Sequence, residues 1–256
     1  MVKTAWGDRI AVEPHKFIGA SLYMRGVHEL PVCEVLWRLA SPGEAAVDVG
    51  ANIGVMTSLL SRRVGAQGRV FAFEAHPEVF QQLELNVRRW NRPWTETHNR
   101  AVSCQSARLI IYEGDGFGLN EGTARMVNSR EHSRSFEVPS VRLDEVLTRD
   151  NCGVIKIDVE GHEAQVLSGA KRYLAEQRFR DVVFESSWDF PGPAHELLLR
   201  YGYTVFELQA CFLGPRLAAV SRRSGHPNRL ADYVATTDLP RAQELVGSAG
   251  WQVLRS

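Results

Sequence analysis

The sequence predicts an α/β domain in which helices cover both faces of a mostly parallel sheet. One apolar run ends in Asp48 and leads into a turn that holds Gly50, Asn52 and Gly54, and a second apolar run ends in Glu74. A stretch with helical spacing separates the two runs. This order of strand, glycine turn, helix, strand and acidic residue is typical of domains that present a nucleoside at the carboxyl ends of their strands. The glycines let backbone approach a ligand closely, and the helix start offers free N–H groups.

Strand and helix patterns alternate along the chain, and this alternation favours a parallel sheet. Apolar runs bounded by turn residues predict strands at 45–49, 69–74, within 95–103, at 107–112, within 136–141, and at 154–159, 181–188, 203–208 and 232–237. Helical spacing of apolar residues predicts helices at 32–40, 53–64, 77–90, from about 163 to 170, at 193–201 and at 240–248.

The remaining segments predict additions to this core rather than a second domain. A small hairpin is expected from Trp6 to Val12, and residues 1–40 as a whole are expected to form a hairpin and helix cap. A β-containing insertion is expected near 106–141, with a long polar loop at 114–135. A basic loop that contains glycine and proline is expected at 214–229. We therefore expect one domain, with a core at 41–237 and a C-terminal helix and tail at 238–256.

Composition excludes several classes of function. The formal net charge is 0, so no overall field favours nucleic acid or an anionic membrane, and neither is an expected partner. Four cysteines without a Cys-x-x-Cys pair argue against a structural zinc site and fit a reducing cytoplasm. The N-terminal stretch lacks the apolar core of a signal peptide, and no run of about 18 apolar residues is present. We expect a cytoplasmic protein.

Acidic residues follow several of the predicted strands. Asp48, Glu74 and Asp158 end strands, and Glu185 lies close to the end of another. Strand carboxyl ends face one crevice in an open α/β sheet, so these carboxylates suit a ligand with hydroxyls, an amino group or a cation. They suit a pyrophosphate poorly. The dinucleotide fingerprint Gly-x-Gly-x-x-Gly is also broken, because Asn52 replaces its middle glycine, and this speaks against an NAD-dependent oxidoreductase.

Three segments resemble the signatures of the FkbM-type methyltransferases, a family that uses S-adenosylmethionine. They read VDVGANIG, FAFEAHP and VIKIDVEGHEAQVLSGA, and the resemblance covers about residues 30–237. The third segment is the most specific to the family, whereas the first indicates only the wider class I methyltransferase superfamily. The resemblance implies a doubly wound, Rossmann-like, seven-stranded mixed sheet with an antiparallel last strand. It also implies methyl transfer, usually to a hydroxyl oxygen of a natural product, sugar or small acid.

The resemblance assigns cofactor roles residue by residue. Gly50, Asn52 and Gly54 would pass beneath the methionine part, and Glu74 would accept the ribose hydroxyls, with Ala75 beside it. Residues 101–103, including Ala101 and Val102, would lie near the adenine, and Asp158 near the methionine amino group or the transferred methyl. Asp48 either bonds the N–H groups of the glycine turn or contacts the cofactor. Glu34, in the helix before the core, is expected to close the cofactor cleft.

Two ways of activating the acceptor hydroxyl stay open. His162, Asp158 and Glu160 are candidate general bases, and a base contributes on the order of 10²–10⁴-fold. Alternatively, Asp158, Glu160 and Glu185 could hold Mg²⁺, which would lower the pKa of the hydroxyl. In the alternative interpretation, His162, Glu160 and Glu163 only favour the start of a helix and have no catalytic role.

We expect an O-methyltransferase for a small molecule. An N-methyltransferase, an NAD-dependent oxidoreductase and a binding module without catalysis are the alternatives, and a homodimer stays open. Trp188 and Phe190 either wall a substrate pocket or pack in the core. A group of arginines is expected to be a solvated surface or a site for an anionic acceptor; it comprises Arg216, Arg222, Arg223 and Arg229.

Overall fold

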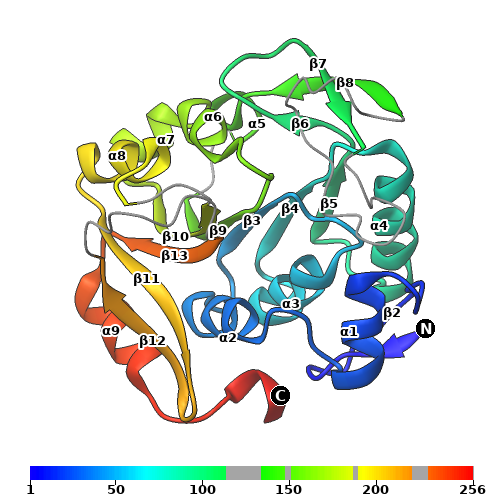
Figure 1. The fold of residues 1–256 in the computed structure, drawn as a ribbon, viewed down its shortest axis with the longest axis horizontal. Helices are drawn as coiled ribbons and strands as arrows, with labels where there is room; N and C mark the ends of the chain where they lie inside the picture. Colours follow the sequence, from blue (N-terminus) through cyan, green and yellow to red (C-terminus); the bar gives the residue numbers. More distant parts are fainter. Residues whose placement is uncertain (114–133, 148–150, 187–189, 221–229, 256) are drawn as a thin grey trace.

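A mixed sheet of eight strands forms the centre of the protein (Figure 1). The computed structural model describes residues 1–113, 134–147, 151–186, 190–220 and 230–255. The strand order across the sheet is β12-β11-β13-β10-β9-β3-β4-β5. The strands are β3 (Ala45–Val49), β4 (Arg69–Phe73), β5 (Thr95–His98), β9 (Cys152–Ile157), β10 (Phe179–Ser186), β11 (Thr204–Cys211), β12 (Gly214–Ala219) and β13 (Ala231–Thr236).

The order and direction of the strands confirm the predicted fold class. Strands β10, β9, β3, β4 and β5 run parallel to one another, whereas β13 lies antiparallel between β10 and β11. The change of strand order falls beside β3, so the carboxyl ends of β3, β4 and β9 meet at one edge. This is the place where open α/β sheets bind ligands.

Helices cover both faces of the sheet because successive side chains of each strand point to opposite sides. One face packs against α2 (Leu30–Leu39), α3 (Val55–Val64), α4 (Pro77–Trp90) and α9 (Leu239–Gly247). The other face packs against α5 (Leu143–Val146), α6 (Glu163–Ser168), α7 (Lys171–Ala175) and α8 (Pro193–Arg200). In β3, Ala46 belongs to the first core and Val47 to the second.

A second, three-stranded sheet forms the predicted insertion. Its strands are β6 (Ala101–Val102), β7 (Arg108–Tyr112) and β8 (Ser135–Val141), in the order β6-β8-β7. The strand predicted within residues 95–103 is thus divided between β5 in the central sheet and β6 in this one. Most of the predicted loop at 114–135 lies outside the described residues.

The N-terminal segment differs from the prediction in two ways. The hairpin pairs β1 (Val2–Lys3) with β2 (Arg9–Ile10), so the expected bounds at Trp6 and Val12 were wrong and Trp6 lies in the connection. A helix that was not predicted, α1 (Phe17–Arg25), follows. Its outer face carries exposed apolar side chains, so its sequence lacks the one-sided spacing that marks an amphipathic helix.

The predicted loop at 214–229 was wrong over its first part. Residues 214–219 form β12, which pairs antiparallel with β11. β12 is an edge strand, and an edge strand tolerates Pro215 because one side of its backbone needs no partner. This strand is the eighth in a sheet for which seven were expected. Of the four arginines singled out there, Arg216 is exposed on β12, and the others lie outside the described residues.

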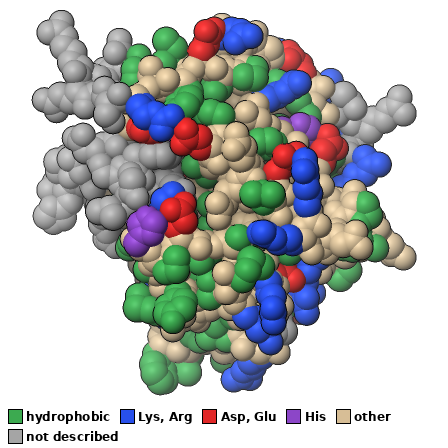
Figure 2. Space-filling view, turned by 90° about the vertical axis from the view of Figure 1, so that its right-hand side faces the viewer, with side chains coloured by type: hydrophobic (Ala, Val, Ile, Leu, Met, Phe, Trp, Pro, Cys, Tyr) green, Lys and Arg blue, Asp and Glu red, His purple; other side chains and the backbone are tan. Residues whose placement is uncertain are grey.

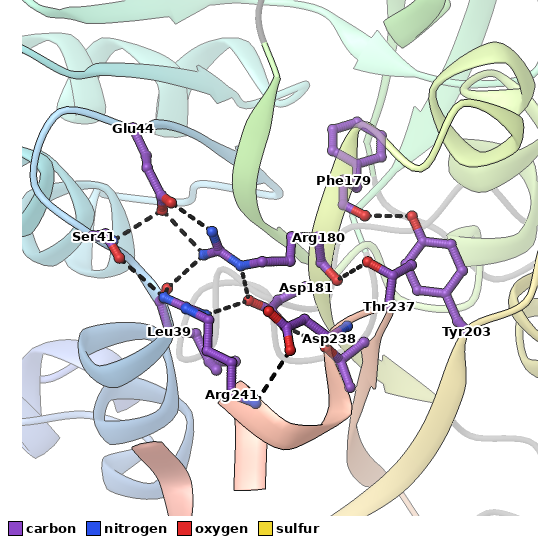
Figure 3. A network of polar contacts seen from close by, with 11 residues as sticks. Leu39, Ser41, Glu44, Phe179, Arg180, Asp181, Tyr203, Thr237, Asp238 and Arg241 are labelled. Carbon is purple, nitrogen blue, oxygen red and sulfur yellow. Dashed lines mark hydrogen bonds and ion pairs between the residues drawn. The ribbon is translucent and has the colours of Figure 1, made fainter. Parts of the chain in front are cut away.

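A polar network fastens the amino ends of the parallel strands, far from the ligand edge (Figure 3). Arg180 bonds both oxygens of Glu44 and also Asp181, and Asp181 in turn contacts Arg241 at 3.2 Å. Arg180 and Arg241 both donate to the carbonyl of Leu39 at the end of α2. The network joins α2, β10 and α9, and its place in the fold gives it a structural role.

The surface carries mixed charge. On the face that Figure 2 shows, basic and acidic side chains stand close to each other. Surface ion pairs such as Arg88–Glu84, at 3.1 Å on α4, fit this picture. No helix in the described ranges has both the length and the apolar character needed to cross a bilayer.

Candidate active site

The turn between β3 and α3 brings two strand ends into close contact. Gly50 has φ +79°, and a Cβ atom at that position would lie 1.8 Å from the carbonyl oxygen of Asp158. Only glycine allows the backbone after β3 to pass so close to the end of β9. Gly54 has φ +97°, and a Cβ there would meet Leu83 at 2.8 Å. The two glycines therefore let the turn pack against β9 on one side and α4 on the other.

Glu74 stands at the end of β4 and accepts two backbone hydrogen bonds. Its carboxylate oxygens are each 2.8 Å from a backbone nitrogen, one of Asn52 in the glycine turn and one of His76. Asn52 adopts φ +49°, which turns its N–H toward Glu74. Burial raises the pKa of Glu74 to about 7, although these N–H groups favour the ionised form.

A cavity of about 260 Å³ lies along the carboxyl ends of β3, β4 and β9. Its walls include nine residues that the sequence had pointed to: Gly50, Asn52, Glu74, Ala75, Ala101, Val102, Asp158, Glu160 and Glu185. Gly54 and Asp48 do not line the cavity. Asp48 is fully buried and accepts a 2.6 Å hydrogen bond from the hydroxyl of Thr57, so it braces the start of α3.

Lys156 is the central cation of the site, and sequence reasoning missed it. It lies on β9 with its side chain 6% exposed, and its ammonium donates to the carbonyl of Gly50 at 3.0 Å. The same ammonium is 3.1 Å from Asp158 and 3.8 Å from Asp48. Burial opposes its charge, but the two carboxylates more than offset burial, so the pKa of Lys156 is raised. The signal in the sequence is a single lysine within an otherwise apolar core strand, which requires a buried partner.

Two further carboxylates adjoin Lys156. Glu185 on β10 pairs in register with Asp232 on β13, and both border a small cleft beside the main cavity. Burial, together with neighbouring carboxylates, raises the pKa of Glu185 to about 8 and that of Asp232 to about 7. Asp158 is already paired with Lys156. Within the described part of the chain, no group of three or more acidic, histidine or cysteine side chains is arranged to hold a metal ion.

These raised pKa values predict that the ligand-free protein loses stability as the pH rises. Between about pH 5 and 8, Glu185 holds its proton in the folded state but releases it on unfolding, so the unfolded state binds fewer protons and the free energy of unfolding falls. Glu185→Gln removes the contribution of Glu185 to this dependence and is expected to raise the melting temperature at pH 8 more than at pH 5. Glu196→Gln, at an exposed position on α8, is the control and should change neither value. Scanning calorimetry at both pH values measures the effect, and equal shifts at the two would contradict it.

His162 lies apart from the cavity lining. Its Nε2 atom is 3.0 Å from the hydroxyl of Ser103, a residue that follows β6. Burial lowers the pKa of His162. Glu160, two residues earlier, does line the cavity and has φ +52°. The structure thus brings Asp158 and Glu160 together at the cavity and turns His162 toward the small sheet. His162 as the base stays a prediction.

The structure gives Glu34 a different role from the one expected. Its carboxylate is fully buried, contacts Arg38 at 2.6 Å and accepts the backbone N–H groups of Gln252 and Val253. It therefore fastens the C-terminal segment to α2, away from the cavity. Phe190 packs against the ring of His195, with centroids 5.2 Å apart, in the core beside α8. Trp188 lies outside the described residues.

The segment before the core supplies a wall of the cavity that the sequence did not reveal. Phe17 and Ile18 of α1 line it, together with His28 and Glu29 from the connection between α1 and α2. Glu29 adopts φ +50°, which is rare for a residue with a side chain. No motif marked these positions, because their meaning depends on how the N-terminal segment folds over the glycine turn.

Comparisons with known proteins agree with this geometry. A family model described as "Methyltransferase FkbM domain" matches residues 48–205. The chain is 31% identical over 195 residues to the hexuronic acid methyltransferase AglP of Haloferax volcanii, covering 73% of this chain and 74% of that one. It is 32% identical over 215 residues to the 31-O-demethyl-FK506 methyltransferase FkbM of Streptomyces tacrolimicus, covering 71% and 81%.

Solved structures are more distant. A SAM-dependent O-methyltransferase of Thermotoga maritima superposes with a TM-score of 0.47 at 15% identity, covering 82% of this chain and 65% of that one.

The glycine turn, the carboxylate after β4 and the mixed sheet define a methyltransferase of the class that uses S-adenosylmethionine. Within that class, the chain belongs to the FkbM methyltransferase domain family.

Proposed function

We propose that the protein is an O-methyltransferase that transfers the methyl group of S-adenosylmethionine to a hydroxyl oxygen of a small molecule. The observation that carries the proposal is the carboxylate of Glu74, which faces the cavity beside the glycine turn and is oriented by two backbone N–H groups. A carboxylate held in this way can accept both hydroxyls of a ribose.

The other cavity residues fit the rest of the cofactor. Gly50 and Asn52 offer close backbone approach to the methionine part, and Asp158 offers an anion to its amino group. Ala75, Ala101 and Val102 form the apolar part of the wall, which suits the adenine. When bound, the cofactor supplies an electrophilic methyl group on a sulfonium. The protein must orient an acceptor oxygen and remove its proton, and orientation contributes roughly 7–11 kcal/mol.

The choice of oxygen as the acceptor atom is supported by the names of the relatives. The Streptomyces relative is named for a 31-O-demethyl substrate, and the Haloferax relative for a hexuronic acid. A homodimer and a cytoplasmic location stay predictions, and so does the alternative in which Mg²⁺ activates the hydroxyl.

Glu74→Gln tests the cofactor assignment through its pH dependence. The ionised carboxylate is the form that accepts hydroxyls, and its pKa is about 7 in the free protein. The affinity for S-adenosylhomocysteine is therefore expected to rise about tenfold from pH 6 to pH 8 in the wild type. Glu74→Gln should bind S-adenosylhomocysteine more weakly, and its affinity should not rise with pH in this way. Titration of the ligand itself affects both proteins equally. Isothermal titration at several pH values measures it; parallel pH curves for the two proteins would refute the assignment.

The acceptor class is tested with isotopically labelled S-adenosylmethionine. D-Glucuronic acid, cyclohexane-1,2-diol and cyclohexylamine offer, respectively, a hydroxy acid, a neutral diol and an amine. Methyl ethers identified by NMR and mass spectrometry on either hydroxyl compound would support O-methylation. Methylation of the amine alone would make the protein an N-methyltransferase. Cofactor binding without any product would argue against the O-methyltransferase assignment.

A further inference from the structure

We propose that His28, oriented by Glu29, is the general base that removes the proton of the acceptor hydroxyl. The inference rests on the proposed O-methyl transfer. It assigns the base to the connection between α1 and α2, a segment that precedes the part of the chain matched by the family model at 48–205.

The two residues form an imidazole–carboxylate pair at the cavity. Nε2 of His28 is 3.4 Å from Oε1 of Glu29, and the imidazole is largely enclosed, with its side chain 12% exposed. The ring of Phe17 meets it edge to face at 5.6 Å between centroids. All three residues line the cavity. A carboxylate on one ring nitrogen fixes the proton there and leaves the other nitrogen as an acceptor.

Three other possible bases, Asp158, His162 and His76, are engaged with neighbouring residues. Asp158 is paired with Lys156, and His162 bonds Ser103 away from the cavity lining. His76 also lines the cavity, but its Nδ1 accepts the N–H of Val79 and its Nε2 contacts Glu113 at 3.4 Å. Among the described residues, Nδ1 of His28 has no hydrogen-bond partner.

The backbone around the pair is strained. Five described residues other than glycine have positive φ, namely Glu29, Asn52, Asn91, Glu160 and Gln177. Three of them, Glu29, Asn52 and Glu160, line the same cavity. Such strain costs stability and clusters at functional sites, where the surrounding structure maintains it. The strain at Glu29 places its carboxylate beside His28 at the start of α2.

Glu29 keeps its carboxylate ionised beside His28. Glu29 itself has a lowered pKa, because the contact with His28 and the charge of Lys156 outweigh burial. The charged residues that line the cavity with the pair are Glu74, Arg100, Lys156, Asp158, Glu160 and Glu185, and Asp232 borders the adjoining cleft. The ionised carboxylate of Glu29 next to Nε2 stabilises the positive charge that the ring acquires when it takes up the proton.

In the proposed step, His28 takes up the proton of the acceptor hydroxyl. The proton of the acceptor O–H passes to Nδ1 of His28 as the oxygen forms a bond to the methyl carbon. The bond from that carbon to sulfur breaks, and its electron pair stays on sulfur, which becomes a neutral thioether. The imidazolium then returns its proton to water.

Two measurements test the pair. The first is kinetic, with the hydroxyl acceptor that the wild type methylates, D-glucuronic acid or cyclohexane-1,2-diol. His28→Gln is expected to lower kcat by roughly 10²–10⁴-fold without changing the affinity for S-adenosylhomocysteine. Glu29→Gln should give a smaller loss. His15→Gln is the matched control, because His15 forms an equivalent contact with Glu13, at 3.6 Å, on the exposed surface. Loss of kcat in His162→Gln but not in His28→Gln would overturn the proposal.

The second measurement needs no acceptor. In ¹⁵N-histidine-labelled protein with S-adenosylhomocysteine bound, the neutral ring of His28 should carry its proton on Nε2, and Glu29→Gln should weaken that preference. The signal is assigned by its loss in His28→Gln. The proposal would be overturned if the ring proton were on Nδ1, or if Glu29→Gln left the tautomer unchanged. If the wild type methylates neither hydroxyl compound, the acceptor assignment fails, and the tautomer still decides whether the pair exists.

Discussion

Lys156→Met is expected to abolish cofactor binding and to destabilise the fold by about 3–5 kcal/mol, the usual cost of removing one partner from a buried ion pair. The substitution leaves Asp48 and Asp158 without their shared cation and releases the carbonyl of Gly50. The glycine turn and the end of β9 would then lose the group that holds them together. Urea denaturation and isothermal titration with S-adenosylhomocysteine measure the two effects.

Lys171→Met is the control for Lys156→Met, because Lys171 is exposed on α7 and its loss should leave both quantities unchanged. The double variant Asp48→Asn/Lys156→Met separates charge from packing. If uncompensated charge causes the loss, neutralising Asp48 should restore part of the stability. Wild-type affinity in Lys156→Met would show that the ammonium does not organise the site.

Gly50→Ala is expected to lose cofactor binding and at least about 3 kcal/mol of stability, from positive-φ strain and steric overlap combined. Its Cβ would stand 1.8 Å from the carbonyl oxygen of Asp158, which is backbone and cannot rotate away. Gly43→Ala is a close control: Gly43 has φ +84°, but the nearest atom to a Cβ there, in the side chain of Gln67, is 4.0 Å away. Gly43→Ala should therefore lose only about 1–2 kcal/mol and keep its affinity.

The difference between the two glycine variants isolates the contact between the turn and β9. Thermal unfolding with and without S-adenosylhomocysteine measures it. Equal losses in both variants would mean that backbone conformation alone, and not the close approach to Asp158, makes glycine necessary at position 50.

The sequence placed the residues proposed to bind the cofactor at one cavity because their signals are local. Gly50, Asn52 and Glu74 lie within one strand–helix–strand unit, and the chain itself brings the end of β4 beside the turn. Asp158 could be placed with them because parallel strands end at the same edge. The alternation of strand and helix predicted the parallel part of the sheet, whereas the antiparallel strand was implied only by the resemblance to the family.

The other half depends on contacts between distant parts of the chain. Lys156 looks like a lone polar residue until its partners on β3 are known, and Glu34 looks like a surface residue until the C-terminal segment covers it. His28 and Glu29 carry no motif, and only the fold of α1 against the core places them at the cavity. β12 was missed because Gly214 and Pro215 resemble a turn, although an edge strand accepts both.

Arg38 and Glu34 fasten the C-terminal tail to α2, beside the cavity wall that His28 and Glu29 form. Arg38 donates to backbone carbonyls between Leu245 and Gly250, while Glu34 receives the N–H groups of the η2 turn (Gln252–Arg255). Both residues belong to α2, the helix that begins directly after Glu29. We therefore expect sequence changes in the last dozen residues to shift α2 and with it the cavity wall at Glu29, even though no described residue of the tail lines the cavity.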